Sequence, residues 1–211
     1  MYRLQALSGV LRETSPPALV EAFALVTVLG GVPFLAVLLA VLYVGWDRET
    51  MAPVVGYGLA AAAVTIALKT GFALPRPPAS VRAAPVDPGS YGFPSGHAVA
   101  ATVVYGGLLL VCDSARESRL AVPFVALIAL VGLSRVVVGV HYLGDVLVGH
   151  AIGLAILVGL RRGVGERADH ACLIAAAVAA VAVPLTGGAT DSLLALGASV
   201  GGAVAFRRTA E

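Results

Sequence analysis

Residues 131–160 read VGLSRVVVGVHYLGDVLVGHAIGLAILVGL, and two features of this stretch guide the interpretation of the whole chain. Its second half is nearly unbroken apolar sequence, of the kind that fills a membrane-spanning helix of about 20 residues. Its first half places a serine–arginine pair, a histidine and an aspartate beside that apolar run. Ionisable side chains are costly at membrane depth, so those that occur there usually serve a function. The stretch therefore predicts a membrane-embedded helix with a polar site at one end.

The composition of the whole chain also indicates a bilayer environment. Of the 211 residues, 59% are hydrophobic and only 12% are charged, whereas about 25% of the residues of a typical soluble domain are charged. The net charge of +2 is small and the basic residues form no stripe, which argues against a nucleic acid partner. The two cysteines match no metal-ligand spacing, and no cluster of carboxylates suits Mg²⁺. We therefore expect neither a metal nor another cofactor.

Seven apolar segments are candidate membrane spans: residues 18–44, 53–69, 97–112, 120–138, 144–160, 170–185 and 191–206. Several are shorter than the usual length of about 20 residues, so six spans is the competing count. The last two could instead form one broken hairpin. The first is interrupted by Gly30, Gly31 and Pro33, which predicts a single kinked span. We expect residues 1–211 to form one all-α domain, a polytopic transmembrane helix bundle of six or seven helices.

The segments between the spans suggest an orientation in the membrane. Residues 1–17 are predicted to be a lead-in that lies on the membrane surface, and residues 70–94, with six of the twelve prolines, form a long ordered loop. With this loop outside, eight arginines fall in the inner loops and tail, and three remain outside apart from the site described below: Arg3, Arg12 and Arg82. Cytoplasmic loops favour basic residues, which places the loop on the non-cytoplasmic face of the cell membrane. Seven spans would then put the amino terminus outside and the carboxyl terminus inside.

Three polar clusters lie at the ends of predicted spans on the side of the long loop: residues 69–77, 94–97 and 134–145. In the third cluster, His141 and Asp145 are four residues apart and would share one face of a helix. A carboxylate that holds one imidazole nitrogen fixes the tautomer and leaves the other nitrogen free to attack an electrophile. Arg135 precedes this pair by only a short turn and is expected to reach the same point.

The remaining polar residues of the clusters suit a phosphoryl group. Guanidinium groups such as those of Arg76 and Arg135 match pairs of phosphate oxygens, and Lys69 adds a point charge. Ser95 and Gly96 come immediately before a predicted helix, whose first backbone N–H groups form a ready anion site. The clusters therefore predict a phosphate-binding site at the membrane surface.

In order and spacing, these clusters resemble the signatures of the type 2 phosphatidic acid phosphatases, a family that shares its fold with vanadium haloperoxidases and bacterial class A acid phosphatases. The family pattern is Lys-x6-Arg-Pro, then Pro-Ser-Gly-His, then Ser-Arg-x5-His-x3-Asp, and residues 69–145 satisfy it without a departure. The resemblance implies a helix bundle of the acid phosphatase/vanadium haloperoxidase type. It also implies a membrane-embedded, metal-independent phosphatase that hydrolyses a lipid phosphate or a polyprenyl diphosphate through a phosphohistidine.

The resemblance also implies a role for each residue of the motifs. His141 would attack phosphorus, Asp145 would orient His141 and stabilise its positive charge, and His97 would protonate the leaving group and then activate water. The phosphate oxygens would be held by Lys69, Arg76, Ser95, Gly96 and Arg135. The substrate would be a lipid phosphate or an isoprenoid phosphate presented among membrane lipids.

Two other functions are compatible with the same residues. A lipid phosphotransferase would use the same site with an alcohol as acceptor, and a non-catalytic anion-binding membrane protein would need only the cations. The presence of both histidines and of Asp145 favours an enzyme.

Outside the motifs, the sequence predicts structural roles. His150 lies nine residues beyond His141 and so on the opposite helix face, which predicts packing or an inter-helix hydrogen bond. The pairs Gly149/Gly153 and Gly197/Gly201 have the spacing of closely packed helices.

Overall fold

The structure is a computed structural model that describes residues 3–84, 90–111 and 118–209. Every regular element in these ranges is helical, which confirms the predicted all-α class. The elements are α1 (Gln5–Glu13), α2 (Pro17–Val26), η1 (Thr27–Gly30), α3 (Val32–Gly45), α4 (Arg48–Phe72), η2 (Ala79–Val81), α5 (Gly96–Val111), α6 (Ser118–Val137), α7 (Leu143–Gly163), α8 (Ala168–Leu185) and α9 (Thr190–Thr209).

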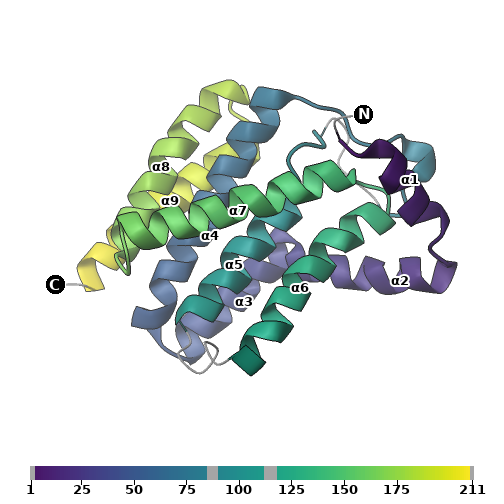
Figure 1. The fold of residues 1–211 in the computed structure, drawn as a ribbon. Coiled ribbons are helices and arrows are strands. Elements are labelled where there is room, and N and C mark those ends of the chain that lie inside the picture. Colours follow the sequence, from purple (N-terminus) through teal and green to yellow (C-terminus); the bar gives the residue numbers. More distant parts are fainter. Residues whose placement is uncertain (1–2, 85–89, 112–117, 210–211) are drawn as a thin grey trace.

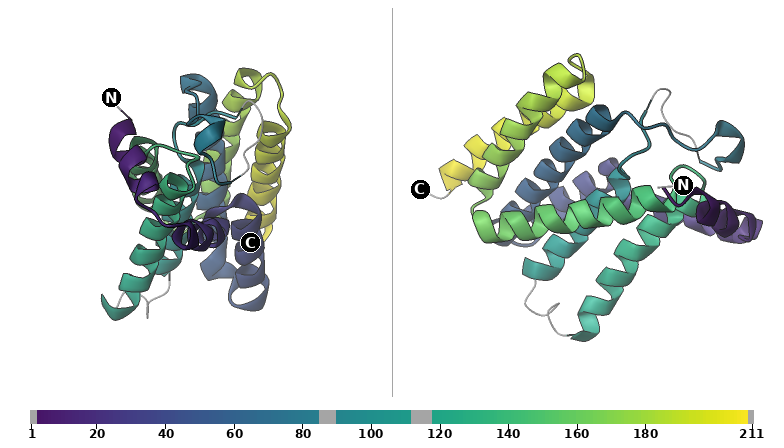
Figure 2. Two further views of the ribbon diagram at one scale, coloured as in Figure 1. Left: turned by 90° about the vertical axis from the view of Figure 1, so that its right-hand side faces the viewer. Right: turned by 45° about the horizontal axis from the view of Figure 1, so that its top comes forward.

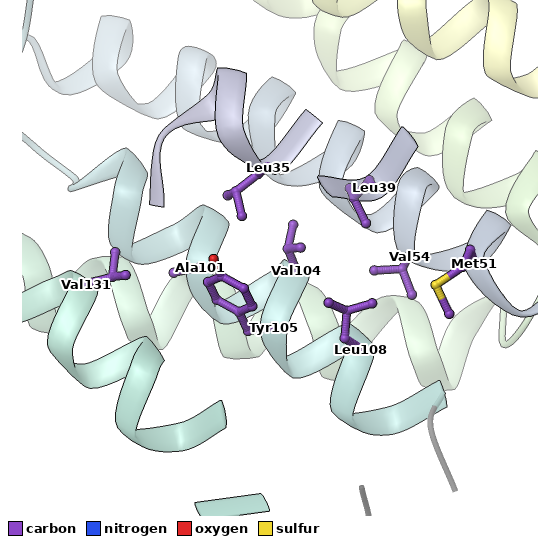
Figure 3. Close-up of a cluster of buried hydrophobic side chains, with 9 residues drawn as sticks. All are labelled: Leu35, Leu39, Met51, Val54, Ala101, Val104, Tyr105, Leu108 and Val131. Atoms are coloured by element: carbon purple, nitrogen blue, oxygen red, sulfur yellow. The ribbon is translucent and has the colours of Figure 1, made fainter. Parts of the chain in front are cut away.

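Helices α4 and α5 form the centre of the bundle (Figure 1). Helix α4 contacts α3, α5, α7, α8 and α9, while α5 contacts α3, α4, α6 and α7. Figure 3 shows the main apolar cluster between them, in which side chains of α3, α4, α5 and α6 interdigitate: Leu35, Leu39, Met51, Val54, Ala101, Val104, Tyr105, Leu108 and Val131. Close packing of these side chains gives the charged residues at the ends of the same helices fixed positions.

Three of the described helices, α4, α7 and α8, are long and apolar enough to cross a membrane. The segment predicted as a kinked span consists of two helical pieces, Pro17–Gly30 and Val32–Gly45, which meet at 51° and together would make a fourth span. The bend occurs at Gly31, within the predicted interruption. Residues 96–111 and 121–137 are apolar but shorter. The last two predicted spans are the separate helices α8 and α9, and the number of crossings stays a prediction.

The two glycine pairs have different surroundings. A Cβ atom at Gly149 would lie 2.8 Å from the carbonyl oxygen of Ser95, so the Gly149/Gly153 pair does allow α7 to pack closely on α5. The same prediction is wrong for Gly197/Gly201, because a Cβ atom at either would meet no described atom within 4 Å. Helix α9 turns Gly202 inward instead, where a Cβ atom would lie 3.0 Å from Cys172 Sγ.

His150 has the structural role that the sequence predicts. Its Nδ1 lies 2.8 Å from Thr102 Oγ1 on α5. The threonine hydroxyl donates its proton to the Ala98 carbonyl at 2.8 Å, so the imidazole is the donor in the inter-helix hydrogen bond.

The two ends of the chain lie at opposite ends of the bundle. Residues 3–13 lie beside α6 and the start of α7, close to the long loop (Figures 1 and 2). At the other end, Phe206 of α9 packs on Tyr43 of α3 with ring centroids 5.8 Å apart. The side of the membrane that each end faces stays a prediction.

Candidate active site

The three predicted clusters meet at one end of the bundle. Lys69 lies in the last turn of α4, Arg135 in the last turn of α6, and Asp145 in the first turn of α7. The remaining predicted residues come from the intervening connections and the start of α5: Arg76, Ser95, Gly96, His97 and His141. The structure brings all eight together, because the helices that carry them pack side by side in the same bundle.

The His141 ring is held by both of its nitrogens. Nδ1 lies 2.6 Å from the carbonyl oxygen of Gly92, and Nε2 lies 3.0 Å from Nη1 of Arg76. A carbonyl oxygen can only accept, so Nδ1 carries the proton and Nε2 presents its lone pair to the Arg76 guanidinium. Asp145 Oδ2 is 3.6 Å from Nδ1. The carboxylate is thus near enough to act as a charge partner, while the closer acceptor is a backbone carbonyl that sequence reasoning missed.

Burial keeps the His141 imidazole neutral. The side chain is almost fully enclosed, and this loss of solvation lowers the pKa of His141 to about 3. Asp145 opposes the shift, whereas the positive charges of Arg76, Lys69 and Arg135 add to it. The ring is therefore neutral at pH 7, with its proton on Nδ1 and a free lone pair on Nε2, as a nucleophile must have.

The Asp145 carboxylate has a partner that the sequence did not predict. Arg3 donates two parallel hydrogen bonds to it, from Nε to Oδ1 at 2.6 Å and from Nη2 to Oδ2 at 2.7 Å. The backbone N–H of Tyr142 donates to Oδ2 at 2.9 Å. Arg3 is only 3% exposed, so the prediction that counts it among the outer arginines apart from the site is wrong. No motif marks this arginine, and its partner lies 142 residues away in the chain.

The cations of the site are fixed largely by main-chain acceptors. Lys69 Nζ donates to the Tyr91 carbonyl at 2.7 Å, and Arg76 Nη1 donates to the Val140 carbonyl at 3.1 Å. Arg76 Nε also donates to Ser90 Oγ at 2.9 Å. These contacts tie the long loop to α4 and to the turn before His141.

Arg135 is oriented by the bent helix pair at the front of the chain. Its Nη1 donates to the hydroxyl oxygen of Thr27 in η1. Thr27 is a third contact that sequence reasoning missed, since it lies inside an apolar segment with no motif of its own.

Two buried polar groups of the site have no hydrogen-bond partner among the described residues: Ser95 Oγ and Arg135 Nε. A buried donor without a partner costs about 1–3 kcal/mol. Gly96, the first residue of α5, approaches the end of α4, where its Cβ position is 3.6 Å from Lys69 Cε. The unpaired groups and the helix amino terminus are together suited to bind an anion with several acceptor oxygens.

His97 follows in the first turn of α5 and lies against the bend of the first helix pair. A Cβ atom at Gly30 would be 3.4 Å from the His97 side chain, and 2.3 Å from Val131 Cγ1. Glycine is required there because any side chain would collide with α6 beside His97. His97 comes directly after Ser95 and Gly96 at the start of α5, so it lies at the same end of the bundle as the other site residues.

Comparison with known proteins agrees with this geometry. The sequence profile of the PAP2 superfamily matches residues 49–169, more than half of the chain. The chain belongs to the PAP2 superfamily. No curated protein sequence matches the chain significantly.

Two solved structures resemble this one. The first transmembrane PAP2 type phosphatidylglycerolphosphate phosphatase from Bacillus subtilis is 27% identical, with a TM-score of 0.65 over 75% of this chain and 82% of that one. LpxE from Aquifex aeolicus is 23% identical, with a TM-score of 0.64 over 74% of this chain and 93% of that one, and shares the fold. The predicted fold is thereby confirmed, and the chain is an integral membrane protein of a phosphatase superfamily.

Proposed function

We propose that this PAP2 protein is a metal-independent phosphatase that hydrolyses a lipid phosphate or a polyprenyl diphosphate through a phosphohistidine on His141. One observation carries the proposal: the buried, neutral imidazole donates from Nδ1 to Gly92 and turns the Nε2 lone pair toward Arg76. A phosphoryl group bound by Arg76 would therefore stand directly before the nucleophilic nitrogen. The same geometry supports the family roles of the motif residues.

In the first step, His141 Nε2 would form a bond to phosphorus while the bond from phosphorus to the leaving oxygen breaks. The ring becomes positively charged, and the Gly92 carbonyl and the nearby Asp145 carboxylate would stabilise that charge. His97 would donate its proton to the leaving oxygen. In the second step, His97 would take a proton from water, whose oxygen attacks phosphorus and releases phosphate and free His141.

The phosphate oxygens would be held by the groups that the structure leaves available around the imidazole. Ser95 Oγ and Arg135 Nε lack partners among the described residues, and each could donate to an oxygen. Lys69, Arg76 and the backbone N–H groups after Gly96 would neutralise the remaining charge. Such preorganised donors stabilise the charge that spreads over the equatorial oxygens in the transition state. The donor set is cationic, so it needs no metal to hold phosphate.

The apolar surroundings support a lipid-like substrate. The bundle exposes many large apolar side chains, among them Leu25, Val37 and Leu154, which suit contact with acyl chains. A resembling protein is itself described as a phosphatidylglycerolphosphate phosphatase. The excess of arginine in the loops at the other end supports an active site on the non-cytoplasmic face of the cell membrane. We treat residues 1–211 as one domain, with the catalytic motifs within residues 69–145.

The test is phosphate release by the purified protein in detergent, in EDTA, from a panel of phosphatidic acid, phosphatidylglycerol phosphate and a polyprenyl diphosphate. We expect turnover of at least one substrate, inhibition by vanadate, and loss of turnover in a folded His141→Ala variant. EDTA inactivation that Mg²⁺ reverses would contradict the metal-independent mechanism. Products that appear only with an added alcohol acceptor would identify a phosphotransferase. Anion binding without any turnover would identify a non-catalytic protein.

A further inference from the structure

The amino-terminal segment is built into the start of α7. The first backbone N–H groups of a helix have no partner within the helix. In α7, Leu143 N donates to Ser8 Oγ at 2.8 Å, and Gly144 N donates to the Arg3 carbonyl at 3.1 Å. A Cβ atom at Gly144 would lie 2.8 Å from Arg3 Cα, so the two backbones are in direct contact. Residues 3–8 thus cap the helix that carries Asp145.

The Arg3 side chain continues from this cap into the active site. Beyond its two bonds to Asp145, it donates from Nη1 to the Pro75 carbonyl at 2.7 Å, one residue before Arg76. Its guanidinium also lies against Gly92, where a Cβ atom would be 2.9 Å from Nη2. One side chain therefore touches the carboxylate beside His141, the residue whose carbonyl holds Nδ1, and the backbone next to Arg76.

We propose that Arg3 is a positioning residue for His141: by fixing Asp145, Gly92 and Pro75, it holds the imidazole with Nε2 facing the bound phosphoryl group. The inference rests on the proposed function of the site. It makes the amino-terminal segment, which lies outside the matched family region, a working part of the active site.

The physical reason lies in the burial of Asp145. Its carboxylate is fully enclosed, and His141 is the alternative partner, 3.6 Å away. A buried carboxylate without Arg3 would pull on the Nδ1 proton, and the ring would rotate away from Gly92. Displacement of a reacting group by about 1 Å can cost about 100-fold in rate. With Arg3 present, both carboxylate oxygens are occupied and the ring keeps its bond to Gly92.

The test compares Arg3→Ala and Arg3→Lys with the wild type, and uses Arg12→Ala as the matched control. Arg12 belongs to the same amino-terminal segment but contacts only the exposed Glu13 among the ion pairs of the described residues, at 3.6 Å. We expect kcat to fall about 100-fold in Arg3→Ala with KM changed less than about threefold. Lysine keeps the positive charge but cannot form the two parallel hydrogen bonds of the guanidinium, so Arg3→Lys should recover only part of kcat. Added guanidinium should partly restore Arg3→Ala, and Arg12→Ala should stay within about twofold of the wild type.

Wild-type kcat in either Arg3 variant would overturn the proposal. So would a loss of kcat that guanidinium does not restore and that follows a loss of thermal stability, because a purely structural role would behave in that way. If Arg3→Ala does not fold, kcat and thermal stability of Arg3→Lys test the proposal in its place.

Vanadate binding, followed by ⁵¹V NMR, gives a readout without turnover and should weaken at least about tenfold in Arg3→Lys. A wild-type protein that binds vanadate but releases no phosphate would refute the proposed function, while this arm still tests Arg3. A wild-type protein that does neither would overturn both proposals.

Discussion

The two flanks of the matched PAP2 region differ in what they contribute to the molecule. Residues 3–45 reach the active site through polar contacts to distant parts of the chain: Arg3 binds Asp145, and Thr27 binds Arg135. Residues 170–209 pack as α8 and α9 beside α4 (Figures 1 and 2). Their buried serines donate to carbonyls of their own chain segment, as Ser199 does to Ala195.

Helix packing restricts the choice of residues much less than an active site does. The buried face of α8 is lined by small side chains at helical spacing: Ala171, Ala175, Ala179 and Ala182. Any small apolar residue would serve there, because contact area and close approach are what stabilise the interface. The amino-terminal flank also contributes single polar side chains, Arg3 and Thr27, which must meet particular partners in the site. We therefore expect substitutions at the polar residues of the amino-terminal flank to change activity. Substitutions in α8 and α9 should change stability instead.

The largest expected effect sets the scale for both flanks. His141→Ala removes the nucleophile, and loss of a nucleophile of this kind costs about ten-thousandfold or more in kcat. The variant should still purify as a monodisperse protein, since the apolar core does not include this side chain. Phosphate release and size-exclusion chromatography measure the two properties. Substantial turnover by the folded variant would remove His141 from the proposed mechanism.

The next effect compares one glycine from each flank. Gly30→Ala would place a methyl group 2.3 Å from Val131 Cγ1 beside His97, so we expect kcat/KM to fall. A shift of about 1 Å in His97 corresponds to about 100-fold. Gly201→Ala adds a methyl group with no described atom within 4 Å. It should leave kcat/KM unchanged and raise stability by up to about 1 kcal/mol. Equal effects of the two substitutions on activity would break the comparison.

A smaller effect is expected for the hydroxyl groups of the two flanks. Thr27→Val removes the acceptor that orients Arg135, so phosphate should bind more weakly, with KM raised about tenfold, as for one lost hydrogen bond to a charged group. Ser199→Ala removes a hydroxyl whose hydrogen bond among the described residues stays within α9, so KM should change less than about twofold. Steady-state kinetics on one substrate measures both. An unchanged KM in Thr27→Val would show that Arg135 needs no help from the amino-terminal flank.

The last prediction concerns topology, and we expect no change in activity. It states which side of the membrane each end of the chain faces. In a cysteine-free background, three variants would each carry one cysteine: Ser80→Cys, one near Met1 and one near Glu211. The two termini lie outside the described residues. A membrane-impermeant thiol reagent applied to intact cells should label Ser80→Cys and the amino-terminal cysteine, and leave the carboxyl-terminal one protected. Protection near Met1 would place Arg3 and the long loop on opposite sides, in conflict with the bond from Arg3 to the Pro75 carbonyl.

Much of the site was predictable because its motifs use local geometry. The prediction that His141 and Asp145 share one helix face is wrong, because α7 begins at Leu143. The two residues still lie close together, since His141 comes just before the first turn of α7, which carries Asp145. Arg135 is linked to them by a turn too short to carry it elsewhere. The family pattern then fixes which helix ends must meet. The roles assigned to Lys69 and His97 stay predictions, but their place at one end of the bundle follows from the same spacing.

Composition and motif spacing alone thus determined the membrane environment, the helical class, the superfamily and the cluster of eight site residues. Tertiary structure alone decided that Gly92 rather than Asp145 is the closer acceptor for His141, that Thr27 orients Arg135, and that Arg3 holds Asp145. A backbone carbonyl leaves no mark in a sequence, since every residue has one. A salt bridge between residues 142 positions apart depends on how the whole chain packs, and no local period or spacing encodes it.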